Sequence, residues 1–435
     1  MAGDMSFKAT LSYHCKRLEI TITSRNFLGV LLPRKATPIQ DLNLAIAAAL
    51  DRPVGSPPFD SLLQKGDTVV IIVSDLSRYT AAHLFLPFIV RRLQRRGIPD
   101  KDITILFSLG IHRAMTFEEQ KAVVGETVAE RIRLQNHDCR STEDLVSLGT
   151  TGNGTPVIIN RRAAEADKVI LTGSIGLHYL AGFGGGRKSI IPGIAAYESC
   201  VAVHLRALMP AKGRHPHACA GNLQGNPMHE EMMDACELVA PAFLMNTVIS
   251  PSDDILEIVA GNWKAAFFEG CRFVDSLCKV PLRQKADLVI ASCGGFPRDI
   301  NFIQAHKTLD YAMNALRSGG ALILVAACKE GIGNQDFLRW LRFQNPLEME
   351  TELRRHYQIN GQTAYATLLK AQRAKIFLLS ELPDFVVRKM SITPVHSLEE
   401  AFAQAQCLVG DNPLTYLIPH GSMVFPCEET TDQEI

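Results

Sequence analysis

This chain is organised around residues 171–206, LTGSIGLHYLAGFGGGRKSIIPGIAAYESCVAVHLR. The stretch begins at the end of an apolar run, residues 169–171, which is typical of a buried strand. The loop after that strand carries a histidine, then four glycines within five positions, and then a lysine: His178, Gly182, Gly184, Gly185, Gly186 and Lys188. A backbone with so few side chains allows a bulky ligand to approach it closely. We therefore expect this loop to bind a ligand.

A helix is predicted after the loop, over residues 195–208. Cys200 and His204 share one face of that helix because they are four residues apart. Within the loop, Lys188 directly follows Arg187, whose charge disfavours the ammonium form of the lysine. A lysine in that state is suited to act as a nucleophile or as a covalent tether.

The same loop also comes close to a nucleotide phosphate loop. Residues 182–189, GFGGGRKS, almost match G-x-x-x-x-G-K-[ST], whose backbone amides surround phosphates. Arg187 stands where the second glycine of that motif is required, and a long connection separates the loop from its strand. A phosphate-loop nucleotide-binding enzyme is therefore kept only as an alternative.

The composition indicates an ordinary globular protein that binds a small molecule. At 435 residues the chain is long enough for two or three domains. Its 45 Lys+Arg balance 45 Asp+Glu, so no basic field favours nucleic acid or an anionic membrane as a partner. The 11 cysteines are scattered and odd in number, which favours free thiols in a reducing cytosol. With no signal peptide or long apolar span in the sequence, we expect a cytoplasmic protein.

The chain in order predicts two series of alternating strands and helices. Near the start, residues 18–23 and 30–32 favour a short antiparallel pair. Buried parallel strands are then expected at residues 68–73, 103–107 and 169–171. Asp75 with Arg78, then His112, and finally His178 each lie just past one of these strands. In open α/β sheets ligands bind at that edge, so we expect these side chains to converge.

The second series begins near residue 286, with strands expected at 286–292, 320–327, 375–379 and 407–410. A helix after the first of these strands carries Gln304 and Lys307 near its start. The predicted fold is α/β, with two doubly wound domains and the active site in the cleft between them. Residues 1–265 are expected to form the N-terminal domain with the glycine loop, and residues 266–435 a C-terminal domain that contributes substrate contacts.

The residue types in this set suggest acid–base chemistry beside a carboxylate. The planar guanidinium of Arg78 can bind a carboxylate through two hydrogen bonds. Two histidines that titrate near neutrality, His112 and His178, suit proton transfer on both sides of a substrate. Inversion at a carbon next to a carboxylate fits this combination, as one possibility among several. No H-x-x-x-H zinc pattern is present, and a metal at His215 and His217 is a further alternative.

Several stretches resemble the nickel-pincer lactate racemase family. They are SDLSR (74–78), GIHR (110–113), GSIGLHYLAGFGGGRKSIIPGIA (173–195), His204, GNPMHE (225–230) and CGGFPRDINFIQAHK (293–307). The resemblance covers the first three-quarters of the chain. It implies two α/β domains and an isomerase, a racemase or epimerase that inverts C2 of a 2-hydroxy carboxylic acid. A small 2-hydroxy acid is then the expected substrate.

The resemblance also implies a cofactor and a role for each matching residue. The cofactor is the nickel-pincer nucleotide, pyridinium-3-thioamide-5-thiocarboxylic acid mononucleotide with Ni(II), covalently linked through Lys188. Its maturation implies cofactor-biosynthesis proteins as partners. The family's nickel ligand matches His204, and its two proton-transfer histidines match His112 and His178. The cofactor-binding positions match Asp75 and the glycine loop, and the substrate contacts match Arg78, Gln304 and Lys307.

The implied mechanism is reversible hydride transfer from C2, in which one histidine takes the hydroxyl proton and the other returns it. Three positions depart from the lactate-type pattern: Tyr79, Ile111 and Ile303. Tyr79 and Ile303 are expected to line the substrate pocket, so a substrate other than lactate is expected. A non-catalytic carrier of the nickel-pincer cofactor is the other alternative, although such a carrier has no use for both His112 and His178.

Overall fold

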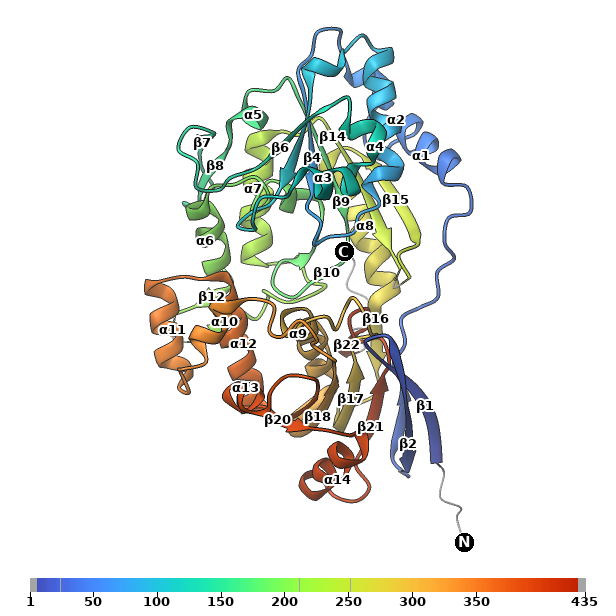
Figure 1. Cartoon of the computed structure of the whole chain (residues 1–435), viewed down its shortest axis with the longest axis vertical. Coiled ribbons are helices and arrows are strands. Elements are labelled where there is room, and N and C mark those ends of the chain that lie inside the picture. The colour runs from blue at the N-terminus through green and yellow to red at the C-terminus, as the bar shows by residue number, and fades with distance from the viewer. Residues whose placement is uncertain (1–5, 24, 211, 251, 429–435) are drawn as a thin grey trace. The chain divides into compact units, whose positions relative to one another are not determined.

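The computed structural model describes residues 6–23, 25–210, 212–250 and 252–428. The chain forms two compact units. We call the unit of Lys35–Leu208 and His215–Ser276 the central unit, and that of Met1–Arg34, Met209–Arg214 and Leu277–Ile435 the terminal unit. The colours of Figure 1 show that the terminal unit contains both the first and the last part of the chain.

The central unit is built on one six-stranded sheet. In spatial order its strands are β15 (Ile255–Gly261), β14 (Phe243–Ile249), β9 (Lys168–Ser174), β4 (Val69–Ser74), β5 (Ile103–Ser108) and β6 (Arg133–Asn136). All neighbours are parallel except β14 and β15. In β4, Val69 to Val73 are all buried, as expected for a strand covered on both faces. Branched apolar side chains therefore fix the middle of this sheet.

Eight helices accompany this sheet in the described residues, with two short hairpins. The helices are α1 (Leu42–Asp51), α2 (Ala82–Arg95), α3 (Phe117–Val124), α4 (Glu126–Ala129), α5 (Arg161–Ala164), α6 (Tyr197–Leu205), α7 (Pro227–Val239) and α8 (Trp263–Cys278). The hairpins pair β7 (Leu145–Thr150) with β8 (Pro156–Asn160), and β10 (Leu177–His178) with β11 (Gly182–Phe183). Short 3-10 turns are η1 (Phe59–Leu62), η2 (Asp100–Asp102) and η3 (Gly186–Ser189).

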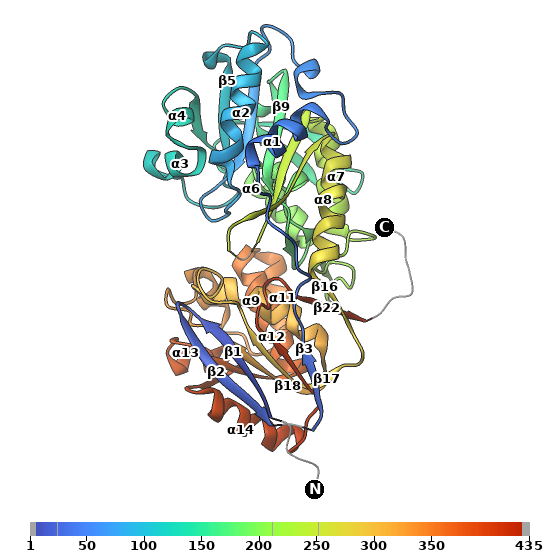
Figure 2. The ribbon, with the colours of Figure 1, turned by 90° about the vertical axis from the view of Figure 1, so that its right-hand side faces the viewer.

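The terminal unit has a second six-stranded sheet, entirely parallel. Its order is β20 (Thr393–Val395), β19 (Lys375–Leu379), β18 (Leu316–Val325), β17 (Ala286–Ser292), β21 (Thr415–Ile418) and β3 (Phe27–Val30). Figure 2 shows the hairpin of β1 (Ser6–Tyr13) and β2 (Lys16–Thr23) beside this sheet. Leu11 and Ile22 of the hairpin share a core with Ile290 and Ile323 of the sheet.

The remaining elements of the terminal unit are mostly helical. The helices are α9 (Phe302–Ala312), α10 (Gln335–Trp340), α11 (Pro346–Arg355), α12 (Ile359–Arg373), α13 (Asp384–Lys389) and α14 (Leu398–Val409), with a 3-10 turn η4 (Met313–Ala315). Two short pairings complete the secondary structure: β16 (Lys279–Leu282) with β22 (Phe425–Glu428), and β12 (Leu208–Met209) with β13 (Gly213–Arg214).

The predicted α/β class with parallel sheets is confirmed, and three local expectations are corrected. Residues 18–23 pair with β1, whereas residues 27–30 join β21 in parallel, so the expected antiparallel pair does not form. Residues 407–410 lie at the end of α14 and not in a strand. The expected domain boundary after residue 265 falls inside α8, and the first 34 residues belong with the second half of the chain.

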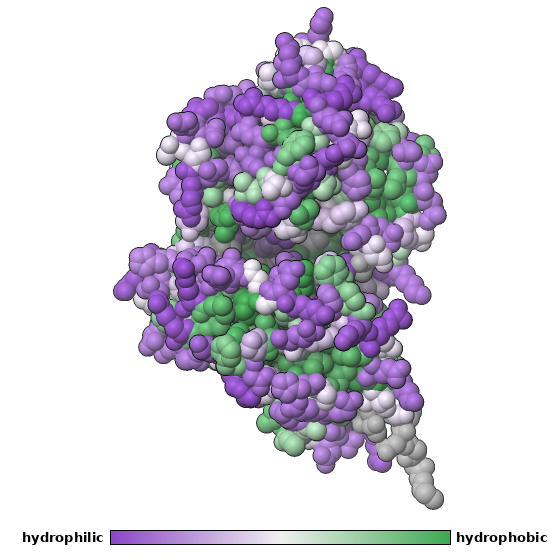
Figure 3. Space-filling model, viewed as in Figure 1, coloured by the Kyte–Doolittle hydropathy of each residue, from purple (hydrophilic) through white to green (hydrophobic). Residues whose placement is uncertain are grey.

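Hydrophilic side chains cover most of the molecular face drawn in Figure 3. In the described part of the chain, buried apolar side chains form a core against the sheet of the central unit and another against the sheet of the terminal unit. Among the described residues, no helix is long and apolar enough to cross a membrane.

Candidate active site

The candidate site of the central unit lies where three neighbouring strands end. β9, β4 and β5 are adjacent and parallel, so their carboxyl ends lie at one edge of the sheet. Asp75 follows β4, His112 follows β5, and His178 follows β9. The backbone N–H of Gly110 donates to the carbonyl of Gly193, which joins the end of β5 to the loop beyond Lys188. The expected convergence at this edge is therefore seen for the strands themselves.

Asp75 and His112 form a direct pair. Oδ2 of Asp75 lies 2.5 Å from Nδ1 of His112, while Oδ1 accepts from the backbone N–H and the hydroxyl of Ser77. The Asp75 side chain is buried, whereas that of His112 is 49% exposed. Burial opposes ionisation, but the hydrogen bonds from His112 and Ser77 and the charges of His112 and Arg78 outweigh it and lower the pKa of Asp75. Asp75 is thus a carboxylate at neutral pH, and it holds the imidazole by Nδ1.

Arg78 lies on the exposed turn after Asp75, where its backbone N–H donates to the Asp75 carbonyl. Its charge contributes to lowering the pKa of both Asp75 and Lys188. The guanidinium is therefore near both groups and accessible to an anion. Tyr79, the next residue, is 47% exposed.

His178 is held by backbone amides in the hairpin of β10 and β11. Its Nδ1 accepts from the N–H groups of Leu180 and Ala181, at 3.3 and 3.1 Å. His178 is paired with Gly182 across the hairpin. Because Nδ1 is an acceptor, the neutral ring carries its proton on Nε2. The two histidines are thus held in opposite tautomers, since His112 donates from Nδ1 to Asp75.

The glycine loop packs closely against β14 and α8. Gly185 and Gly186 have positive φ angles of 69° and 53°, which favour glycine. A Cβ atom at Gly185 would lie 2.7 Å from Oδ1 of Asn246, and one at Gly186 would lie 2.5 Å from the Phe267 ring. At Gly184 the nearest atom would be 3.6 Å away, which is an ordinary contact. Packing inside the protein therefore requires glycine at Gly185 and Gly186, whereas the surroundings of Gly184 would tolerate a Cβ atom.

Near the end of this loop, the surroundings of Lys188 and His204 lower the pKa of both side chains. Burial and the positive charges of Arg187 and Arg78 lower the pKa of Lys188 well below its ordinary value. Burial, with the charge of Lys188, lowers the pKa of His204 to about 4. His204 donates from Nδ1 to the Cys200 carbonyl at 2.7 Å, so the lone pair of the neutral ring is on Nε2. This arrangement favours the nucleophilic form of Lys188 and provides an imidazole in the form that binds metals.

Gln304 and Lys307 belong to the terminal unit, on the first turns of α9. The amide oxygen of Gln304 accepts from Nζ of Lys307 at 2.8 Å, and Asn301 caps the helix by accepting from the Gln304 N–H. In the central unit, Asp75 and His112 are thus in direct contact, and the charge of Arg78 lowers the pKa of both Asp75 and Lys188. In the terminal unit, Gln304 is paired with Lys307.

Three contributors to the site were missed at the level of the sequence. Ser77 orients Asp75, Asn246 accepts from the Gly186 N–H at 2.8 Å, and His229 binds Arg187. Ser77 lies inside the SDLSR stretch, two residues after Asp75, so its hydrogen bond to Asp75 could have been predicted from that spacing. Asn246 is an amide within the apolar strand FLMNTVI, and such a buried polar group requires a partner.

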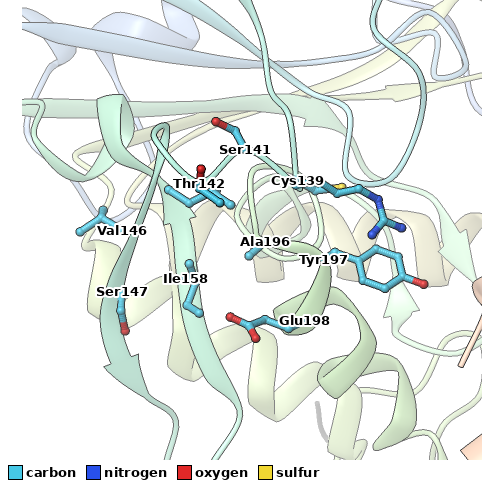
Figure 4. Close-up of a pocket in the computed structure, with 11 residues that line it drawn as sticks. Cys139, Ser141, Thr142, Val146, Ser147, Ile158, Ala196, Tyr197 and Glu198 are labelled. Atoms are coloured by element: carbon cyan, nitrogen blue, oxygen red, sulfur yellow. The ribbon is translucent and has the colours of Figure 1, made fainter. Parts of the chain in front are cut away.

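Two other features carry none of the predicted site residues. An open cavity of about 570 Å³ lies at the start of α6, lined by residues that include Cys139, Ser141, Tyr197 and Glu198 (Figure 4). His215 and His217 form hydrogen bonds within their loop. Nδ1 of His215 accepts from the backbone N–H of His217, and Nδ1 of His217 donates to the carbonyl of Gln224. Within the described ranges, no three His, Cys, Asp or Glu side chains form a group that could hold a metal ion.

Comparison with known proteins assigns the chain to a family. Residues 13–215 match the lactate racemase N-terminal domain, and residues 282–425 match the lactate racemase C-terminal domain. The lactate racemase of Thermoanaerobacterium thermosaccharolyticum is 31% identical over 390 residues, which are 88% of this chain and 90% of that protein. The lactate racemase of Lactiplantibacillus plantarum is 31% identical over 424 residues, 94% of this chain and 97% of that protein.

Solved structures agree with this assignment. The lactate racemase apoprotein from T. thermosaccharolyticum superposes with a TM-score of 0.90 at 30% identity, over 97% of this chain and all of that chain. A crystal structure of a protein from Thermotoga maritima has a TM-score of 0.66 at 18% identity, over 91% of this chain, and is similar in fold. Fold and sequence together define a racemase, an isomerase built from two α/β domains. The chain belongs to the lactate racemase family.

Proposed function

We propose that this racemase inverts C2 of a 2-hydroxy carboxylic acid by reversible hydride transfer, with a nickel-pincer nucleotide attached to Lys188. The substrate class is supported by the relatives named lactate racemase. When bound, the nucleotide supplies a hydride acceptor that does not exchange with water. Direct removal of a proton from C2 beside a carboxylate forms a poor carbanion, so a hydride acceptor lowers the barrier more easily.

The residues of the glycine loop fit such a group, and this fit carries the proposal. Burial and the positive charges of Arg187 and Arg78 lower the pKa of Lys188, which favours the neutral amine, the form that can become covalently linked. His204 is a neutral imidazole with its lone pair on Nε2, which suits Ni(II). One protein imidazole is sufficient if the pincer supplies the other nickel ligands.

His112 is the proposed base for the substrate hydroxyl. Its Nδ1–H is directed to Asp75, so Nε2 has the lone pair that accepts a proton. The Asp75 carboxylate then stabilises the imidazolium that results. Half of the His112 side chain is exposed, which leaves it accessible to a substrate.

His178 is the proposed proton carrier for the opposite enantiomer, because its Nδ1 accepts from two backbone N–H groups and leaves the proton on Nε2. Arg78 is proposed to bind the substrate carboxylate because it is accessible and planar. Gln304 and Lys307 are proposed substrate contacts from the terminal unit. Asp75 and the glycine loop are proposed to contact the cofactor as well.

The proposal is tested by mass and by activity on the same sample. Protein produced together with the cofactor-building enzymes is expected to exceed its sequence mass by one pincer nucleotide, and Lys188→Ala is expected to abolish the increase. Lys264→Ala, which removes an exposed lysine paired with Glu237, is the matched control and keeps the adduct. An adduct that survives Lys188→Ala would overturn the tether.

The loaded protein is then assayed against a panel of chiral 2-hydroxy acids. Because of Tyr79 and Ile303, we expect the highest kcat/KM with an acid other than lactate, one with a longer or differently polar side chain. An adduct without racemisation of any acid in a broad panel would instead support a cofactor carrier. The highest kcat/KM with lactate would show that these two residues do not set the substrate.

A further inference from the structure

Arg187 is a fully buried cation at the base of the glycine loop. Its side chain is 0% exposed. Burial lowers its pKa, but only to about 10, so the guanidinium remains charged at neutral pH. The partners that the structure gives it among the described residues are two carbonyls, one imidazole and one aromatic ring, all uncharged. A buried charge is costly without strong partners, so its contacts indicate what it holds in place.

One side of the guanidinium holds the hairpin that carries His178. Nη1 donates to the carbonyl of Phe183 at 2.9 Å, and Nη2 donates to the carbonyl of Ala181 at 2.7 Å. Ala181 is also the residue whose N–H donates to Nδ1 of His178. Phe183 is paired with Leu177, the neighbour of His178 in β10. The fork of Arg187 therefore fixes both the turn and the strand that hold the His178 ring.

The other side of the guanidinium is anchored to two helices. Nε donates to Nδ1 of His229 on α7 at 3.1 Å, and the guanidinium lies 4.3 Å from the ring centroid of Phe267 on α8. The His229 and Phe267 rings are stacked, with centroids 6.2 Å apart. Burial, with the charge of Arg187, lowers the pKa of His229 to about 3, so its ring is neutral and Nδ1 can accept.

We propose that Arg187 is a positioning residue, which ties the hairpin of β10 and β11 to α7 and α8 and thereby fixes the orientation and tautomer of His178. This inference rests on the proposed role of His178 in proton transfer. A lysine cannot replace the arginine here, because a lysine lacks the planar fork that reaches two carbonyls and an imidazole at once. The same residue precedes Lys188, so one side chain supports the hairpin of a proposed catalytic group next to the proposed tether.

The test compares Arg187→Lys with Arg161→Lys. Arg161 also binds two backbone carbonyls, of Glu143 and Leu145, but it belongs to α5 and touches no site residue in these contacts. The first readout is the ¹⁵N NMR spectrum of His178 in cofactor-free protein, assigned with His178→Gln. In the wild type and in Arg161→Lys, we expect Nδ1 at the frequency of an unprotonated nitrogen and Nε2 at that of an N–H nitrogen. In Arg187→Lys, we expect the frequencies of Nδ1 and Nε2 to become more similar to each other, because the ring is no longer held in one tautomer.

The second readout is the kinetics of the loaded enzyme. Arg187→Lys is expected to lower kcat about 10²-fold, the effect of a small misplacement of a catalytic group, with KM changed much less. Arg161→Lys is expected to remain at the wild-type rate. If Arg187→Lys does not fold, His229→Leu removes only the Nε partner and is expected to show the same spectral change to a smaller extent. His229→Gln, which can still accept from Nε, is expected to restore the wild-type spectrum.

An unchanged His178 spectrum in folded Arg187→Lys, or in His229→Leu if that variant alone folds, would overturn the positioning role. Failure of the proposed function has a different result. In that case His178→Gln retains full racemase activity, while Arg187→Lys still changes the spectrum of the His178 ring.

Discussion

Replacing Asp75 by Asn is the sharpest perturbation of the proposed base, because it preserves the shape of the side chain and removes only its charge. Oδ2 of Asp75 accepts from Nδ1 of His112 at 2.5 Å. In Asp75→Asn, the amide oxygen can still accept both hydrogen bonds from Ser77. The amide NH2 group then faces His112. That group donates to Nδ1 and moves the ring proton to Nε2. The base then has no lone pair where the substrate is expected.

The size of the effect follows from the contacts that are lost. A hydrogen bond to a charged group contributes about 1.5–3 kcal/mol. If this stabilisation is present only while His112 carries the proton, its loss lowers kcat by about 10–150-fold. The unfavourable tautomer adds to that loss. Stability is expected to change by less than about 1 kcal/mol, because His112 is half exposed and the pair is screened by water.

The assay is the initial rate of racemisation for both enantiomers, measured on protein with equal cofactor loading, together with a urea unfolding curve. Ser77→Ala is the matched control, because it removes a hydrogen bond to Oδ1 of Asp75 and leaves the bond to His112 intact. We expect it to lower kcat by less than about tenfold. A kcat for Asp75→Asn within threefold of the wild type would refute the assignment of His112 and Asp75 as a functional pair.

Three further outcomes are expected. His204→Ala is expected to lose nickel by metal analysis while the mass adduct on Lys188 still forms, and unchanged nickel would place the ligand elsewhere. A substrate deuterated at C2 is expected to keep its label in the inverted product in ordinary water, whereas loss of label in step with inversion would make His112 and His178 bases for C2 itself. The pKa of His229 is about 3 in the folded protein and about 6.5 in the unfolded chain. Because the unfolded chain binds the extra proton, this contribution to stability is complete above about pH 6.5 and falls as the pH falls toward 3. At pH 5 the free energy of unfolding is therefore expected to be about 2 kcal/mol lower than it is above pH 6.5. Urea unfolding at pH 5 and 7.5 is expected to show that loss in the cofactor-free wild type and a smaller one in His229→Gln.

The sequence predicted the elements of the fold better than their partners. Continuous apolar runs marked β4, β5 and β19 correctly, because a parallel strand covered on both faces has few polar positions. Thr116 and Glu119 form a capping box at the start of α3, and the spacing of such a box is visible in a sequence. The pairing of β3 with β21 was not predictable in this way, because a short strand has no local feature that identifies a partner far along the chain.

For the candidate site, too, the sequence predicted some features and could not predict others. The approach of Asp75 to His112 followed from the positions of their strands in the sequence, since adjacent parallel strands end at one edge. The tautomers of His112 and His178 depend on which atoms surround each ring, and no sequence pattern gives those. The contact between Arg187 and His229 joins residues 42 positions apart through a buried side chain, and arginine is ordinarily expected at the surface.

The pairing of β3 with β21 has a consequence for the order in which the two units can fold during synthesis on the ribosome. Phe27 is made long before its partner Thr415. At roughly 5–20 residues per second, synthesis of the intervening chain takes on the order of 20–80 seconds. During that time the edge strand of the second sheet lacks its partner strand. Every strand of the first sheet, from β4 to β15, is made before that partner. The central unit is therefore expected to fold first during translation, and the N-terminal segment to dock last.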